Sequence, residues 1–414
     1  MATVIPDRFH SLTPGDSPGV KSFPHLERLA GLEAAVGVPL GLRHRALTFD
    51  GPQNGSARTA IEALFDQAIA AANGRAAVMF SGGRDSSVVL ALATASCRRL
   101  GAPDPVAVTA VYPGDEAADE DSWQRLVLRH LDLQAHRRIV VTDQRRALSE
   151  RARSSMTKRG SLWPPAVHTQ DLFFEVAPRS ALFTGEGGDG ILEQRRVTPV
   201  TLVRQDAPRV RASLALAALG ALVPNAPHAL GAIAARLATW ELPWIRASAR
   251  PRIAQLDTVH RGPLHWGSAT LFILQYRSIE LLLHNTCKVA ADWGVDLYHP
   301  LIEPSFVAAL AKQGGAWGYR GRTDMFRRLF GDLLPDKILA RQSKAAFNES
   351  RWGDDERDFA SSWSGEGLVP SVIDVEALRA QWLSPRPHPA AIGLVQDAWL
   401  ATRSASESGA GAQW

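Results

Sequence analysis

The chain has 414 residues, of which 45% are hydrophobic and 21% charged, a composition typical of a globular protein with one large or two smaller domains. Its 46 basic and 42 acidic residues leave a net charge of +4, without the dense Lys/Arg block of a nucleic-acid tract. The longest apolar stretch, 212–223, is too short to span a bilayer. Two cysteines and an N-terminus unlike a signal peptide predict a cytoplasmic protein without disulfides.

The first half of the chain alternates apolar runs with helical patterns, which predicts an α/β fold with a doubly wound parallel sheet. Residues 1–55 are rich in Pro and Gly and are expected to form an N-terminal arm or a remnant subdomain. Strands are expected at 76–81, 106–112, 137–141 and 180–184. Helices are expected at 56–72, 86–100, 119–132, 143–156 and 169–178.

After about residue 195 we expect a mostly α-helical half without further strands. The helices are expected at 206–222, 227–240, 268–292, 304–313, 323–332 and 390–403. We interpret 56–404 as one domain, divided into 56–195 and 196–404, followed by a mobile tail at 405–414. Trp240 and Trp244 are expected to serve packing.

The segment 80–87, FSGGRDSS, joins a predicted strand to a predicted helix and contains Gly82 and Gly83. Its glycines let backbone N–H groups converge, and the helix N-terminus adds partial positive charge, so the turn can hold a phosphate. Hydroxyl groups add further donors. They belong to Ser81, Ser86 and Ser87. The alternative is an ordinary strand-turn-helix capped by Asp or Ser.

A second glycine-rich segment, 183–190 (FTGEGGDG), follows the strand at 180–184. Ligands of open α/β sheets bind at the carboxyl ends of the strands, so we expect this segment to lie beside the first loop. One carboxylate from each segment, Asp85 and Asp189, can then share a Mg²⁺ ion and bridge it to phosphate oxygens. The alternative is a flexible glycine turn with solvated acids.

Four blocks occur in order: 81–87 (SGGRDSS), 185–189 (GEGGD), 294–303 (GVDLYHPLIE) and 333–347 (LLPDKILARQSKAAF). The first resembles the SGGxDS signature of the N-type ATP pyrophosphatases (PP-loop proteins). Together, over roughly residues 58 to 400, they resemble the synthetase domain of class B asparagine synthetases, whose wider family includes β-lactam synthetases and lasso-peptide macrolactam cyclases. This resemblance implies that a carboxylate attacks Mg-ATP and releases pyrophosphate, after which an amine forms the amide and releases AMP.

The resemblance also implies roles for single residues. The nucleotide-binding set is Ser81, Gly82, Gly83, Asp85, Ser86, Ser87 and Gly185. Asp85 and Asp189 would bind Mg²⁺. Lys344 matches the lysine near the phosphate and the developing oxyanion, although without the family it resembles a solvated loop cation. Asp296 stands where the family usually has Glu, and it either takes the proton of the amine or caps the turn before Pro300.

Departures from the family lie on the acceptor side. Position 2 is Ala2, where asparagine synthetases have the nucleophilic cysteine of a glutaminase, and about 57 residues precede the synthetase-like part. Tyr298 replaces the usual Arg, and Gly190 replaces a second acid. We therefore expect an amine other than glutamine-derived ammonia, with lactam or macrolactam closure in natural-product biosynthesis as the preferred subtype.

The expected partners are a small-molecule or peptide carboxylate and amine, together with a precursor-peptide or leader-binding protein. We expect no nucleic acid and no membrane insertion. The helical insert at 205–250 is the expected docking place for a large substrate or partner. Two other hypotheses stay open at this point: a PP-loop tRNA-modifying nitrogen or sulfur transferase, and a non-catalytic partner subunit.

Overall fold

The computed structural model describes residues 25–43, 55–193, 242–256, 263, 265–343 and 349–410. The insert expected at 205–250 therefore lies outside the described residues except for 242–250, and so does Trp240. Among the described residues, no helix is long and apolar enough to cross a membrane.

A five-stranded parallel sheet forms the centre of the molecule, with strand order β3-β2-β1-β4-β5. The strands are β1 (Ala76–Met79), β2 (Val106–Val111), β3 (His136–Val140), β4 (Ala181–Phe183) and β5 (Asp296–Tyr298). This confirms the α/β, doubly wound fold. The strand order reverses between β1 and β4, and ligands of such sheets bind beside that point.

One strand was not expected. The prediction of a second half without strands is wrong at β5, which pairs with β4 and completes the sheet. β5 has only three residues, and its first residue, Asp296, is an exposed acid. So short a run carries too little hydrophobic periodicity to be distinguished from a loop.

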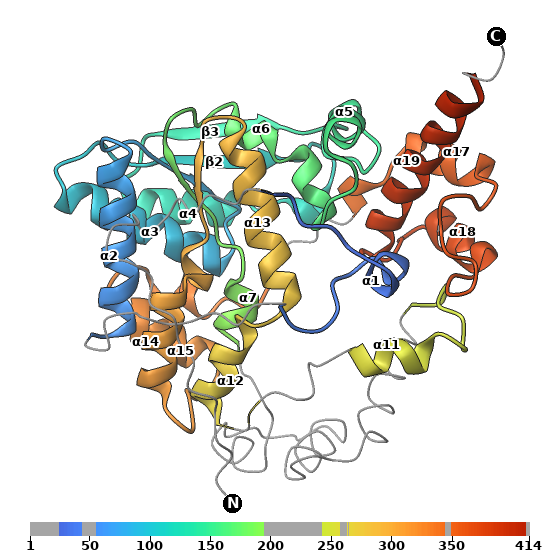
Figure 1. Cartoon of the computed structure of the whole chain (residues 1–414). Coiled ribbons are helices and arrows are strands. Elements are labelled where there is room, and N and C mark those ends of the chain that lie inside the picture. Colours follow the sequence, from blue (N-terminus) through green and yellow to red (C-terminus); the bar gives the residue numbers. More distant parts are fainter. Residues whose placement is uncertain are drawn as a thin grey trace, which may run out of the picture.

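Helices cover both faces of the sheet (Figure 1). Those in the first half are α1 (Leu32–Val36), α2 (Ala57–Ala71), α3 (Arg84–Arg99), α4 (Asp121–His130), α5 (Glu150–Arg159), α6 (Asp171–Phe174) and α7 (Gly188–Ile191), with 3₁₀ turns η1 (Glu116–Ala118) and η2 (Pro165–Thr169). Those in the second half are α11 (Arg250–Leu256), α12 (Trp266–Ile273), α13 (Arg277–Ala291), α14 (Pro304–Gly314), α15 (Arg322–Phe330), α16 (Asp336–Leu339), α17 (Asp354–Ser362), α18 (Val375–Leu383) and α19 (Ala391–Ala410), with η4 (Pro300–Ile302) and η5 (Glu349–Arg351).

Several expected helix boundaries differ from the structure. The helix expected at 169–178 spans only Asp171–Phe174, after the 3₁₀ turn η2. The helix expected at 143–156 begins only after Ser149, whose side chain accepts a hydrogen bond from the backbone of Ala152 and caps the helix. The single helix expected at 268–292 is two helices, because the backbone at Tyr276 and Arg277 pairs with 41–42. Finally, α19 continues to Ala410, into the segment expected as a tail.

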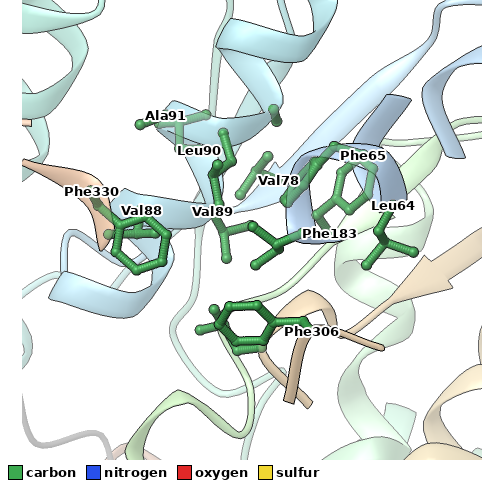
Figure 2. Packing of buried hydrophobic residues seen from close by; sticks show 14 of the residues in the cluster. Leu64, Phe65, Val78, Val88, Val89, Leu90, Ala91, Phe183, Phe306 and Phe330 are labelled. Carbon is green, nitrogen blue, oxygen red and sulfur yellow. The ribbon is translucent and has the colours of Figure 1, made fainter. Parts of the chain in front are cut away.

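Side chains of each strand alternate between two hydrophobic clusters, one on each face of the sheet. Val78 and Phe183 belong to the larger cluster, while Ala77 and Leu182 belong to the cluster on the other face. Figure 2 shows Val78 and Phe183 packed beside Phe65 of α2, whose ring centroid lies 4.4 Å from that of Phe183. Because both of their faces are covered, β1, β2 and β4 are apolar runs rather than alternating sequences, whereas the edge strand β3 (HRRIV) has no buried residue.

A third cluster holds the C-terminal helices together. In Figure 1, α1, α17, α18 and α19 gather at the right of the molecule. Their core includes the fully buried Trp244 and Trp382, which confirms the packing role expected for Trp244. The indole ring of Trp363 lies 4.7 Å from that of Trp382, centroid to centroid.

A buried histidine links β4 and α13 near the carboxyl end of the sheet. His299 Nδ1 lies 2.6 Å from the hydroxyl of Thr184, and its Nε2 lies 2.8 Å from the hydroxyl of Thr286. Thr286 donates its own proton to the carbonyl of Leu282, so it accepts from Nε2–H, and Nδ1 accepts from Thr184. Burial lowers the pKa of His299 to about 4, and the ring is therefore neutral.

This histidine predicts a loss of stability in acid. The pKa is about 4 in the folded chain and 6.5 ordinarily, so the stabilisation is complete above pH 6.5 and declines as the pH falls towards 4. We expect a contribution of about 2 kcal/mol to be lost between neutral pH and about pH 5. Urea unfolding at both pH values measures it. His299→Gln should lose less stability than the wild type over this interval, whereas the control His130→Gln, at the exposed end of α4, should behave like the wild type. Equal pH dependence in all three proteins would contradict the assignment.

Candidate functional site

The segment 80–87 forms a tight turn at the carboxyl end of β1. The Ser81 and Ser86 hydroxyls are 3.0 Å apart, and Ser86 donates to the carbonyl of Gly83 over 3.1 Å. Helix α3 begins at Arg84, so its first backbone N–H groups belong to this turn. Ser87 is fully buried inside α3, and its hydroxyl has no partner among the described residues.

The second glycine-rich segment packs directly against this turn. A methyl group added at Gly185 would lie 2.8 Å from the backbone nitrogen of Ser86, and one at Gly188 would lie 2.5 Å from the Asp85 carboxyl carbon. Both values are far below van der Waals contact, so only glycine allows this approach. The structure thus brings the two segments together at the strand-order reversal between β1 and β4.

The carboxylates of both segments meet one guanidinium group. Arg322, the first residue of α15, donates through Nη2 to both carboxylate oxygens of Asp85, at 2.6 and 2.7 Å. Its Nη1 donates to Asp189 over 2.7 Å and to Glu193 over 3.3 Å. Burial raises the pKa of Asp85 above its ordinary value, although the guanidinium acts against this. A cation at this point therefore favours the ionised form of Asp85.

The arrangement suits a divalent cation that is shared with phosphates. Mg²⁺ commonly takes one or two protein carboxylates and completes its shell with phosphate oxygens and water. Asp85 and Asp189 already share one positively charged group, the guanidinium of Arg322, and they would share a Mg²⁺ ion in the same way. Within the described residues there is no group of three or more His, Cys, Asp or Glu that could hold a metal by itself. The residues thus fit a substrate-bound cation rather than a metal cage made by the protein alone.

A buried ion pair holds the turn at 80–87 in place. Arg341 forms a bidentate pair with Glu120, and its Nη1 also donates to the carbonyl of Gly82 over 2.9 Å. The side chain amide of Gln124 donates to the carbonyl of Ser81 over 3.0 Å. The two charged side chains are only 3% and 5% exposed, so removal of either one would leave an uncompensated buried charge.

A cavity of about 250 Å³ opens next to this turn, at the carboxyl end of β2. Its wall includes Tyr112, Gly114 and Gln124. Several acids also line it: Asp115, Glu116, Asp119, Glu120 and Asp121. Arg138 lines it as well. Asp121 pairs with Arg138 and Glu120 with Arg341, so Asp115, Glu116 and Asp119 are the acids that the cavity offers to a ligand as hydrogen-bond acceptors.

Two expected catalytic residues are not placed in this site. Lys344 lies outside the described residues. Asp296 is exposed at the first position of β5 and pairs with Ala181, the first residue of β4, so it lies at the amino end of its strand. The two glycine-rich segments lie at the opposite, carboxyl edge. The role expected for Asp296 stays a prediction, and its position gives it no support.

Sequence reasoning missed three residues of the site. Arg341 stands in the block 333–347, before Lys344, and a conspicuous Arg in that frame was a usable signal. Glu120 had no signal, because only the fold brings it to Arg341 from 221 positions away. Arg322 follows a glycine at a helix start, a pattern that does not indicate ion pairing with residues 133 and 237 positions away.

The close approach of the two segments predicts different effects for two neighbouring glycines. Gly188→Ala should destabilise the chain by about 2 kcal/mol, because the methyl group overpacks Asp85 and Leu301. Gly190→Ala is the matched control: it lies in the same short helix with open space around it, so it should be neutral or slightly stabilising. Urea unfolding of both variants checks this, and equal stabilities would mean that the two segments are not in contact.

Two comparisons with known proteins bear on this site. The family model for asparagine synthase matches residues 60–396, which is most of the chain. The match includes both glycine-rich segments, Arg322 and Arg341. No curated protein matches the chain. From the length of the family match, the chain belongs to the asparagine synthase family of ATP-dependent, amide-forming synthetases.

Proposed function

We propose that this protein is an AMP-forming amide synthetase that adenylates a carboxylate and couples it to an amine. The observation that carries the proposal is the shared contact of Asp85 and Asp189 with one cationic group, between the carboxyl ends of β1 and β4. That arrangement places two carboxylates beside a turn of backbone N–H groups and serine hydroxyls. An ATP site needs both parts, because donors hold the phosphates and carboxylates hold their cation.

The nucleotide has room along the same edge. We assign its pyrophosphate to 81–86 and its nucleoside to the cavity at the end of β2, whose volume is about 250 Å³. The acceptors in that cavity suit the amino group of adenine and the hydroxyls of ribose, which are donors. The cations Arg84 and Arg322, which both lie over the ring of Phe326, add positive charge on the phosphate side.

In the proposed site Asp85 and Asp189 hold Mg²⁺. When bound, this ion neutralises charge on the phosphate oxygens and orients them. The turn residues Ser81, Gly82, Gly83 and Ser86 supply donors to the departing pyrophosphate. Ser87 and Gly185 support the site without donating to phosphate in this proposal. Ser87 is buried inside α3, and Gly185 allows the close contact with the backbone of Ser86.

The proposed reaction has two steps. An oxygen of the substrate carboxylate attacks the α-phosphorus of ATP, the bond to the β-phosphate oxygen breaks, and pyrophosphate leaves with that electron pair. The amine then attacks the acyl carbon and loses a proton, and AMP leaves. A carboxylate is a poor electrophile, so the first step supplies a leaving group, while the protein supplies position and charge neutralisation. Lys344 is proposed to act at the phosphate and the oxyanion in these steps.

We propose lactam or macrolactam closure as the subtype, with the amine on the same molecule as the carboxylate. The departures from asparagine synthetases at Tyr298, the last residue of β5, and at Gly190 support a changed acceptor. A peptide substrate would agree with a precursor-peptide or leader-binding partner. Release of AMP with linear peptides, but not with aspartate and ammonia, tests this subtype.

Substitution of the buried metal-site carboxylate tests the function. Asp85→Asn keeps the shape and removes the charge, so exchange of labelled pyrophosphate into ATP, measured with a panel of carboxylates, should fall at least about 100-fold. The control is Asp104→Asn, which should retain exchange. Asp104 is an acid outside the turn, and its carboxylate lies 2.9 Å from Nε of Arg98. Exchange that is unchanged in Asp85→Asn would remove this residue from the site, and ADP as the product would refute adenylation.

A further inference from the structure

A second cavity, of about 380 Å³, lies among the C-terminal helices. It shares no lining residue with the cavity beside the turn at 80–87. In Figure 1, α1 and α19, which line it, lie at the right of the molecule, whereas α3, which begins in that turn, lies at the left. Small-molecule sites usually have volumes of about 300–1,000 Å³. The second cavity therefore has room for a small ligand, away from the proposed nucleotide site.

The wall of this cavity combines apolar side chains with two opposite charges. Leu29, which precedes α1, Leu162, which follows α5, and Leu400 of α19 are among its apolar residues. One cation and one acid, Arg28 and Asp397, line the same space. A ligand that fills the cavity must therefore be partly apolar and must meet charges of both signs.

Backbone oxygens hold the positive group in place. The Arg28 guanidinium donates through Nη1 to the carbonyl of Ser161 over 3.0 Å and through Nη2 to the carbonyl of Arg159. It lies so close to Gly160 that a methyl group there would be 2.2 Å from Nη1. A guanidinium has five N–H donors, so these two hydrogen bonds fix its position and leave donors for a ligand.

The negative group stands apart from the positive one. In the described part of the chain, Asp397 and Arg28 form no ion pair with each other, although the charge of Arg28 acts on the carboxyl group. Burial raises the pKa of Asp397 to about 6, while the Ser161 hydroxyl and the charge of Arg28 act against this rise. The protein thus compensates this carboxylate only in part, and a further cation beside it would favour its ionised form.

We propose that this cavity binds a free α-amino acid with an apolar side chain, its carboxylate on Arg28 and its ammonium group on Asp397. Such a ligand bridges two opposite charges that face one cavity without pairing with each other, through charge-assisted hydrogen bonds at both ends. Its side chain packs against the leucines and loses contact with water. A ligand with one charge would displace water from the other protein charge without replacing it. The site does not depend on the proposed ATP chemistry.

Three probes with one carbon skeleton test the two charges separately. Leucine carries both charges, 3-methylbutylamine lacks the carboxylate, and 4-methylpentanoate lacks the ammonium group. Dissociation constants, measured by saturation-transfer NMR on the full chain, should be at least about tenfold higher for each single-charge probe than for leucine. An affinity for either analogue equal to that for leucine would overturn the proposal.

Two variants should give opposite patterns with these probes. Asp397→Asn should weaken leucine and 3-methylbutylamine about tenfold and leave 4-methylpentanoate unchanged, whereas Arg28→Gln should weaken leucine and 4-methylpentanoate and leave the amine unchanged. The control is Asp358→Asn, which changes an exposed acid of α17 outside the cavity and should bind all three probes like the wild type. Leucine affinity that is unchanged in both cavity variants would overturn the proposal.

Two further variants locate the bound ligand. Ala34→Phe, in α1, fills the cavity without changing a charge and should abolish leucine binding. Asp85→Asn changes the proposed ATP site and should leave leucine affinity as in the wild type. Leucine binding that persists in Ala34→Phe, or that Asp85→Asn abolishes, would overturn the proposal, because the ligand would then bind elsewhere in the protein.

Discussion

The contact of Arg322 with Asp85 and Asp189 is the interaction on which the site depends. It joins a residue of α15 to two loops that follow β1 and β4, so three distant parts of the chain meet at one charge. Burial raises the pKa of Asp85, and a neighbouring cation counters this by favouring the carboxylate. The protein supplies that cation with its own guanidinium group, and the proposed substrate complex supplies it with Mg²⁺.

The sheet makes this contact possible. The chain extends the sheet from β1 to β3 in one direction and from β4 to β5 in the other, so the strand order reverses between β1 and β4. The loops that follow these two strands therefore lie side by side at the reversal. Gly185 then lets the two backbones touch at Ser86, and Gly188 leaves room for the carboxyl group of Asp85. Behind the loops, Arg341 and Glu120 fix the turn through the carbonyl of Gly82. The geometry of the site is therefore set by packing before any ligand binds.

Much of the fold could be predicted from local sequence, because β1, β2 and β4 are apolar runs flanked by amphipathic helices. The sequence also predicted that Asp85 and Asp189 lie close together, because parallel strands place their carboxyl ends at one edge of the sheet. Partners that only tertiary structure creates could not be predicted, as for Arg322 and the pair of Arg341 and Glu120. The short strand β5 was missed for lack of periodicity. The resemblance of four blocks spread over both halves led to the family that the comparison supports, whereas the acceptor depends on residues whose roles no local pattern specifies.

A double-mutant cycle on cation affinity tests the shared role of the two carboxylates most directly. The dissociation constant of Mn²⁺ in the presence of ATP would be measured by electron paramagnetic resonance for wild type, Asp85→Asn, Asp189→Asn and the double variant. If both residues hold one ion, each single change weakens binding, and the double variant departs from the sum of the single effects by a coupling of about 0.5–3 kcal/mol. Strictly additive effects, or Mn²⁺ affinity unchanged by either substitution, would contradict the account.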